Sequence, residues 1–292
     1  MKRGKSRRLF KKKKSHSNQR LGCIIAIIVL IPICYGLYLY YQQYSVQHSS
    51  KPQIETSVSL PTPSGKDLEI PVSLITRQEQ IIRHKGYTVS YNKDLKIPNW
   101  VSYELTRQET KGKEKRGDNF IADPLVKGAI ATNADYARSG YDKGHMAPAA
   151  DMKWSPDVMK ESFYFSNMCP QHPQLNRRGW KNLEEKIRDW AVADSAIIII
   201  CGPIIDKPSK TIGKNKVAVP ERFFKVILSP FVKPARGIGF LFNNRQAVEP
   251  LSTYAVSIDS IEKLTHMDFF SPLPDEIENA VEANADYYQW PR

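Results

Sequence analysis

Two short stretches of the chain decide its fold and its chemistry. The first is Y-D-K-G-H-M-A-P at residues 141–148, and the second, about thirty residues later, is L-N-R-R-G-W at 175–180, followed by Leu183 and Glu184. A histidine with a pKa near neutrality can accept a proton from water. Amide and carboxylate oxygens are ligands that Mg²⁺ prefers. The two stretches therefore contain the parts that metal-assisted hydrolysis of a phosphodiester requires.

The second stretch predicts a helix from about residue 173 or 174 to residue 190. Its apolar positions fall on one face of an α-helical wheel: Trp180, Leu183, Ile187 and Trp190. Asn176 lies in the middle of this stripe, and Glu184 lies on its flank. A side-chain amide that faces inward has to be hydrogen-bonded or bound to a ligand. Helix capping by Asn176 is the simpler alternative.

Apolar and β-branched runs predict a fold dominated by strands. The expected strands are 87–91, 100–105, 196–201, 223–228, 237–242 and 255–258, with turns at 92–94 and 97–99 and a short helix at 260–265. The run 196–201 is so apolar that it predicts a central strand buried on both faces. One long helix among many strands indicates an α+β domain.

The net charge of +13 belongs to the start of the chain. Residues 1–20 hold ten Lys or Arg and no acid, which leaves 33 basic and 30 acidic residues after position 50. Residues 21–41 are uncharged, rich in Ile, Leu and Val, and long enough to cross a bilayer as a helix. Because the basic residues precede this segment, we expect a cytoplasmic tail (1–20), one transmembrane helix (21–41) and the rest of the chain outside, periplasmic or extracellular.

Two other interpretations of the start of the chain are open. A cleaved signal peptide is disfavoured, because no small-residue cleavage pattern follows the long apolar run. Binding of nucleic acid by the basic tail is a further alternative to contact with anionic lipid headgroups. Residues 42–74 are polar and proline-containing and predict a linker, so that the globular domain spans 75–292. Whether Cys169 and Cys201 form a disulfide is left open.

The motif at 140–148 resembles the D-R-G-H signature of the DNA/RNA non-specific endonucleases. Further motifs of this family recur in order at residues 120–124, 131–136, 166–171 and 175–184, so the resemblance covers roughly 80–275. It implies a ββα-metal nuclease fold with a central, mostly antiparallel sheet and one Mg²⁺, with Mn²⁺ as a substitute. The implied substrates are DNA, RNA or both, and the implied products carry 5′ phosphates.

The resemblance also implies roles for individual residues. His145 matches the general base, Asn176 the direct metal ligand, and Glu184 the residue that holds the water shell of the metal. Asn167 and Arg188 match positions that support the site and contact phosphate.

Four basic residues complete the expected site. Arg116 aligns loosely with a phosphate-contacting arginine, and Lys143 replaces the arginine of the signature. Lysine keeps the charge but loses the bidentate fork, so we expect a weaker contact with phosphate. Arg177 and Arg178 extend a basic patch beside the metal-bearing helix, for which an ordinary solvated surface is the alternative. Such a patch would bind the backbone of a polynucleotide and not read its bases.

Other functional classes remain open at this point. A catalytically weak or inactive envelope protein that only binds nucleic acid is the main alternative to the nuclease, although it would be expected to have lost His145 or Asn176. A membrane-anchored interaction protein is a further alternative. The sequence does not determine the oligomeric state.

Overall fold

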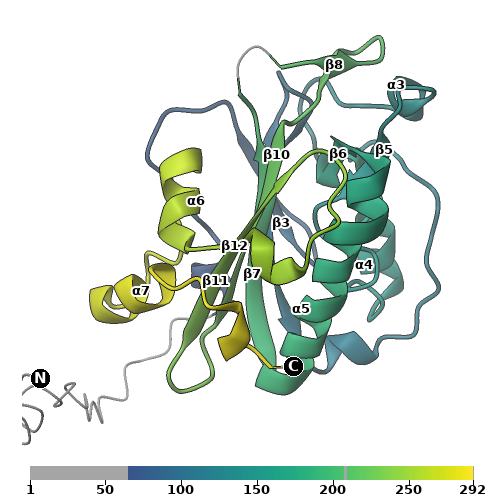
Figure 1. Cartoon of the computed structure of the whole chain (residues 1–292). Helices are drawn as coiled ribbons and strands as arrows, with labels where there is room; N and C mark the ends of the chain where they lie inside the picture. Colours follow the sequence, from purple (N-terminus) through teal and green to yellow (C-terminus); the bar gives the residue numbers. More distant parts are fainter. Residues whose placement is uncertain (1–64, 207–208, 292) are drawn as a thin grey trace, which may run out of the picture. The chain divides into compact units, whose positions relative to one another are not determined.

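The structure, a computed structural model, describes residues 65–206 and 209–291 (Figure 1). The predicted tail, the predicted transmembrane helix and the linker up to residue 64 lie outside the described residues. Within the part of the chain that is described, no helix is both long enough and apolar enough to cross a bilayer.

A seven-stranded sheet forms the centre of the domain, and every pairing within it is antiparallel. In spatial order its strands are β12 (Ala255–Val256), β11 (Arg236–Asn243), β10 (Arg222–Ser229), β7 (Ala196–Ile204), β4 (Ile97–Thr106), β3 (Thr88–Asn92) and β2 (Gln80–Arg83). All nine residues of β7 are buried. The α+β class, the antiparallel sheet and the buried central strand are therefore confirmed.

Helices cover both faces of this sheet (Figure 1). Ile197 and Ile199 of β7 belong to one apolar core, with the buried residues of α5 (Lys181–Asp194). Ile198 and Ile200 belong to the other, with buried residues of α6 (Ile258–Thr265) and α7 (Asp275–Glu282). Successive side chains of a strand point to opposite faces of the sheet, so this one apolar run contributes residues to both cores.

The two motif stretches fold into one compact unit on the α5 side of the sheet. β5 (Asp142–His145) pairs antiparallel with β6 (Met168–Gln171), and the chain continues through a π-helical turn, η3 (Leu175–Trp180), into α5. This is a strand–strand–helix arrangement, as predicted. Gly144 permits the pairing, because a Cβ at this position would lie 2.4 Å from the Gln171 side-chain oxygen.

Shorter elements complete the described chain. The helices among them are α2 (Gly65–Leu68), α3 (Asn133–Tyr136), α4 (Pro156–Glu161), η1 (Glu109–Lys111), η2 (Phe165–Asn167), η4 (Leu251–Tyr254) and η5 (Tyr287–Gln289). The strands are β1 (Val72–Ser73), β8 (Thr211–Ile212), β9 (Val217–Ala218) and β13 (Met267–Asp268). β1 pairs with β13, and Leu68 is fully buried, so these parts of the expected linker 42–74 pack with the domain.

Three further expectations differ from the structure. Residues 97–99 are not a turn but the start of β4, where a register shift accommodates the proline. Residues 257–258 do not continue β12, because Ser257 caps α6: its side-chain oxygen accepts a hydrogen bond from the backbone N–H of Ser260. The first turn of the long helix is π-helical and not α-helical, so the wheel misplaces Asn176. Cys169 and Cys201, whose pairing was open, are both free and buried.

Candidate active site

His145 stands at the end of β5 in a closed aromatic pocket. Its ring meets Phe163 edge-on at 5.0 Å between centroids, and Phe120 at 5.6 Å. The residue is only 7% exposed, and its buried Nε2 has no hydrogen-bond partner. Burial, reinforced by the charges of Arg116 and Lys143, lowers the pKa of His145 to about 3. The imidazole is therefore neutral at physiological pH and able to accept a proton.

Asn176 is fixed by the acidic residue of the first motif. Its side-chain Nδ2 donates a 2.9 Å hydrogen bond to Asp142 Oδ2, and Arg177 donates to both oxygens of the same carboxylate at 2.8 Å. Burial alone would raise the pKa of Asp142, but hydrogen bonds from Arg177 and Asn176 hold it below its ordinary value. Because the amide nitrogen is engaged, the Oδ1 carbonyl oxygen of Asn176 is the atom free to bind a ligand.

Asn176 is therefore hydrogen-bonded, as an inward-facing amide must be, but it is half-buried and contacts β5 instead of lying within the apolar stripe. The rest of that stripe is confirmed: Trp180, Leu183, Ile187 and Trp190 are all buried. Trp180 also ties the helix to β5, since its Nε1 donates to the backbone oxygen of His145 at 3.3 Å.

Glu184 lies half-buried in the first turn of α5. Its carboxylate makes no hydrogen bond or ion pair within the described residues. Burial raises the pKa of Glu184 to about 7, against the opposing charge of Lys225. A carboxylate with unused oxygens and a raised pKa is suited to binding a cation or the waters around one.

Arg188 is locked into a buried network that supports the same face of α5. Its Nη1 contacts Asp151 Oδ1 at 2.8 Å, and Tyr103 donates from its hydroxyl to Asp151 Oδ2, also at 2.8 Å. Asp151 is 1% exposed, and burial raises its pKa although Arg188 opposes this. Arg188 is half-buried, so the guanidinium is held in place and only partly covered.

Lys225 is a charged residue of the site that the sequence analysis missed. It lies fully buried in β10, with Nζ 4.5 Å from the centroid of the Trp180 ring. Nζ has no hydrogen-bond partner among the described residues. Its charge acts on Glu184 and Asp151. One lysine inside the otherwise apolar run F-F-K-V-I-L was the signal that could have identified it.

Asp142 and Asp151 were also given no role by the sequence analysis. Asp142 is the acid of the signature itself, and Asp151 follows the apolar residues after it. Both were visible as acids beside the motif, but their partners Asn176 and Arg188 lie more than thirty positions away.

Lys143 and Arg116 place positive charge beside the histidine. Lys143 Nζ donates to Asn133 Oδ1 at 2.8 Å and lies 4.1 Å from the centroid of the Phe120 ring. The guanidinium carbon of Arg116 is 5.4 Å from the centroid of Phe163. Phe120 and Phe163 are the two rings that contact His145, so both cations lie around its pocket.

The remaining two predicted residues occupy different environments. Asn167 is fully buried; its amide accepts from Ala147 N and donates to the backbone oxygens of Ala147 and Ser162. It therefore supports the segment after His145 and is not placed to contact a phosphate. Arg178 is exposed and forms no ion pair within the described residues, whereas Arg177, also exposed, is paired with Asp142.

The protein supplies few ligands for a metal at this site. In the described part of the chain, no group of three acidic, histidine or cysteine side chains surrounds Asn176. The oxygen donors available are the carbonyl of Asn176 and the carboxylate of Glu184. This small set of hard oxygen donors fits Mg²⁺, which keeps several waters and binds in part through substrate phosphates.

Comparison with known proteins identifies the family. The DNA/RNA non-specific endonuclease model matches residues 64–276, and the chain belongs to this family. A nuclease from Nostoc sp. is 30% identical over 250 residues, covering 80% of this chain and 88% of the relative. Human mitochondrial endonuclease G is 34% identical over 208 residues, covering 65% of this chain and 69% of the relative.

A solved structure shows the same fold. The crystal structure of the EndoG/EndoGI complex, described as revealing the mechanism of EndoG inhibition, contains a chain that superposes with a TM-score of 0.64 at 28% identity. The match covers 68% of this chain and 89% of that chain. The mixed fold with its central antiparallel sheet thus matches that structure. Membership of the family supports nuclease activity.

Proposed function

We propose that the protein is a membrane-anchored, Mg²⁺-dependent endonuclease that hydrolyses DNA, RNA or both without sequence specificity. The observation that carries this proposal is the strand–strand–helix unit, in which a neutral, unpartnered His145 stands on the same strand as the carboxylate that orients Asn176. A neutral imidazole with an unpaired nitrogen can accept a proton from water, and oriented amide oxygens bind hard cations.

In the proposed reaction, His145 accepts a proton from water at Nε2, and the resulting hydroxide attacks the phosphorus in line with the leaving 3′ oxygen. Asn176 and Glu184 would hold Mg²⁺, or Mn²⁺ in its place, directly or through water. The metal supplies stabilisation of the negative charge that develops on the phosphoryl oxygens. The aromatic rings of Phe120 and Phe163 contribute to the burial that keeps the imidazole neutral.

Lys143, Arg116, Arg178 and Arg188 are the cations that we propose face the substrate. Lys143 and Arg116 lie beside the histidine pocket, where a phosphate would meet positive charge on approach. Arg177 is paired with Asp142, so we assign it first to orienting that carboxylate and only then to the polynucleotide backbone. Contacts of this kind bind backbone phosphates without reading bases.

The anchoring part of the proposal rests on the sequence of residues 1–41. The uncharged segment 21–41 would cross the bilayer, with the basic tail 1–20 in the cytoplasm and the nuclease domain outside. Carbonate extraction of membranes tests the anchor, and protease accessibility of the domain in intact cells tests its side. Release of the full chain by carbonate, or protection of the domain from protease, would contradict this part.

The activity is tested with the full chain in mild detergent on supercoiled plasmid and on RNA, in Mg²⁺, in Mn²⁺ and in EDTA. We expect cleavage of at least one polynucleotide in Mg²⁺, 5′ phosphates on the products, and no cleavage in EDTA. A folded protein that binds plasmid in a salt-dependent way but leaves it intact with every divalent ion would establish the inactive nucleic-acid-binding alternative.

A further inference from the structure

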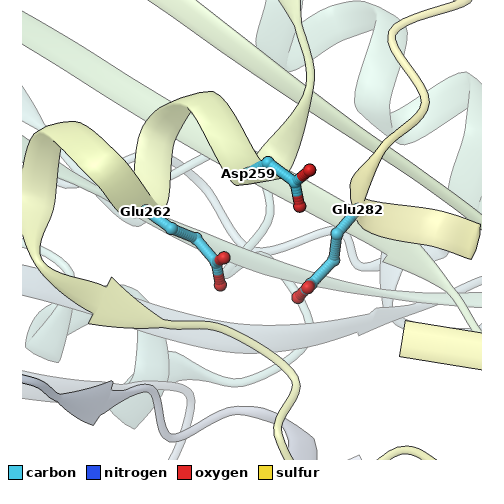
Figure 2. A group of neighbouring side chains, drawn as sticks. All are labelled: Asp259, Glu262 and Glu282. Carbon is cyan, nitrogen blue, oxygen red and sulfur yellow. The ribbon is translucent and has the colours of Figure 1, made fainter. Parts of the chain in front are cut away.

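Three carboxylates converge on the face of the sheet opposite to α5. Asp259 and Glu262 lie on α6, and Glu282 is the last residue of α7 (Figure 2). One ligand oxygen from each lies within 4.8 Å of those of the other two. No lysine, arginine or histidine of the described chain forms an ion pair with any of them. Three close carboxylates without a cation repel one another.

Glu282 distinguishes this group from an ordinary acidic surface. The residue is only 6% exposed, and its Oε1 is buried with no hydrogen-bond partner. Figure 2 shows its carboxylate turned toward that of Glu262. A buried carboxylate without partners is unfavourable, and such groups are normally paired or bound to a metal. Burial, together with the neighbouring carboxylates, raises the pKa of Glu282 to about 9.

The other two residues are placed to share a ligand with Glu282. Asp259 and Glu262 are three positions apart on α6 and therefore project from the same side of the helix. Glu262 Oε1 accepts a 2.8 Å hydrogen bond from the backbone N–H of Phe269, which orients its carboxylate and leaves the second oxygen for another partner. Both residues are half-buried, so the group is accessible to water and ions.

We propose that Asp259, Glu262 and Glu282 bind a Ca²⁺ ion that joins α6 to α7. The three oxygens lie within 4.8 Å of one another, so one hard cation can contact all of them. Mg²⁺ requires near-octahedral coordination, whereas Ca²⁺ takes more ligands in a flexible geometry. Ca²⁺ also accepts irregular coordination and completes its shell with water, as a site built from two short helices requires.

The ion would act on stability and not on the nuclease reaction. α6 and α7 contribute Ile258, Ile261 and Val281 to the core on their side of the sheet. Met146 and Leu175, which adjoin His145 and Asn176 in the chain, belong to the other core, with α5. An ion that binds the folded state but not the unfolded state raises the temperature of unfolding. Cross-linking the two helices through their carboxylates would hold α7 on the sheet.

Thermal unfolding of the full chain in mild detergent tests the site, with CaCl₂ or MgCl₂ added to protein first stripped with EDTA. The measurements are made in an Asn176→Ala background, so that the proposed catalytic metal does not contribute. We expect millimolar Ca²⁺ to raise the unfolding temperature more than Mg²⁺ does. Glu282→Gln and, as a second variant at a more exposed position, Asp259→Asn should abolish this difference. Glu276→Gln, an exposed change on the same helix, should leave it intact.

Nuclease activity provides the second readout. In the background with Asn176 intact, Glu282→Gln should cleave plasmid in Mg²⁺ at the parental rate, because the residue is remote from His145. The proposal is overturned if Ca²⁺ stabilises Glu282→Gln and Asp259→Asn as much as the parent, or if Ca²⁺ shifts the parent no more than Mg²⁺ does. The proposed nuclease function would be refuted by a different result, namely that the parent protein shows no Mg²⁺-dependent cleavage.

Discussion

The side chain of Asn176 donates a 2.9 Å hydrogen bond to the carboxylate of Asp142, 34 positions earlier in the chain. This contact joins the two motifs: Asp142 begins β5, whose last residue is His145, and Asn176 lies in the π-helical turn that leads into α5. It also determines which end of the amide is available, since only the carbonyl oxygen is left for a ligand. The acid of the signature thus serves as a positioning residue for the proposed metal ligand.

Asp142→Asn should weaken metal binding without removing a metal ligand. The substituted amide loses the charge that holds Arg177 and competes poorly for the Asn176 N–H. Loss of a positioning partner of a metal ligand typically costs about 10- to 100-fold in affinity. We therefore expect the Mg²⁺ concentration for half-maximal cleavage to rise by that range, with most activity regained at saturating Mg²⁺. Asp157→Asn, an exposed acid on α4, is the control. Loss of activity that Mg²⁺ does not restore would contradict the positioning role.

Glu184→Gln should stabilise the metal-free protein at alkaline pH. Burial raises the pKa of Glu184 from 4.5 to about 7, so the folded state holds this proton more tightly than the unfolded state does. Tighter binding of the proton by Glu184 in the folded state adds stability that is fully present below pH 4.5 and is lost as the pH rises through 7. In EDTA the variant should therefore gain roughly 2 kcal/mol over the parent at pH 8 and little at pH 4.5.

Urea unfolding of Glu184→Gln at the two pH values measures this difference, and Glu185→Gln, exposed at the next position, is the matched control. A gain that is equal at both pH values would show that Glu184 keeps an ordinary pKa. In the presence of Mg²⁺ the parent should instead be more stable than Glu184→Gln, because only the parental carboxylate can bind the ion or its waters.

Lys225→Met should shift the pH dependence of cleavage. The buried ammonium opposes protonation of Glu184, so its removal raises the pKa of that carboxyl further. At limiting Mg²⁺ we expect the rising limb of the pH–rate profile to move up by about one unit, with activity recovering at high pH. Lys225→Arg, which keeps the charge, should restore the parental midpoint if it folds. An equal loss of rate at every pH would assign Lys225 a purely structural role.

Lys143 should act on substrate binding more than on the chemical step. Lys143→Arg restores the bidentate fork of the family signature, so we expect a several-fold lower KM for plasmid with kcat little changed. Lys143→Met should raise KM about tenfold and reduce the salt dependence of binding, because one phosphate contact is lost. Steady-state kinetics over a series of salt concentrations measure both effects. A change in kcat with KM unchanged would place Lys143 in the chemical step instead.

The sequence alone predicted those features of the fold that depend on local periodicity and composition. The apolar run 196–201 predicted a strand buried on both faces, and the stripe from Trp180 to Trp190 predicted the buried side of the long helix. These patterns follow from the repeat of a single helix or strand, so they can be recognised without knowing which elements pack against it. The turn predicted at 97–99 failed because tertiary pairing with β3 overrides the local preference of Pro98 and Asn99.

The candidate site was predicted in its main residues but not in its connections. His145, Asn176 and Glu184 stand in recognisable motifs. The interactions of Asp142, Asp151 and Lys225 depend on contacts between elements that are distant in the sequence. An α-helical wheel assumes a constant repeat, so it could not show that the π-helical turn changes the direction of Asn176. Asn167 was placed at the site but not inside the protein, because the family signature does not separate an amide that binds substrate from one that binds backbone.

The proposed nuclease reaction depends above all on His145 as the general base. The most direct measurement is the rate of Mg²⁺-dependent plasmid cleavage by the full-length His145→Ala variant, with its fold checked by thermal unfolding and with Asn167→Asp as a marker of purely structural damage. General acid–base catalysis contributes about 10²- to 10⁴-fold, so His145→Ala should lose at least about 100-fold in kcat while still binding plasmid. A folded His145→Ala variant that cleaves within tenfold of the parent would show that His145 is not the general base.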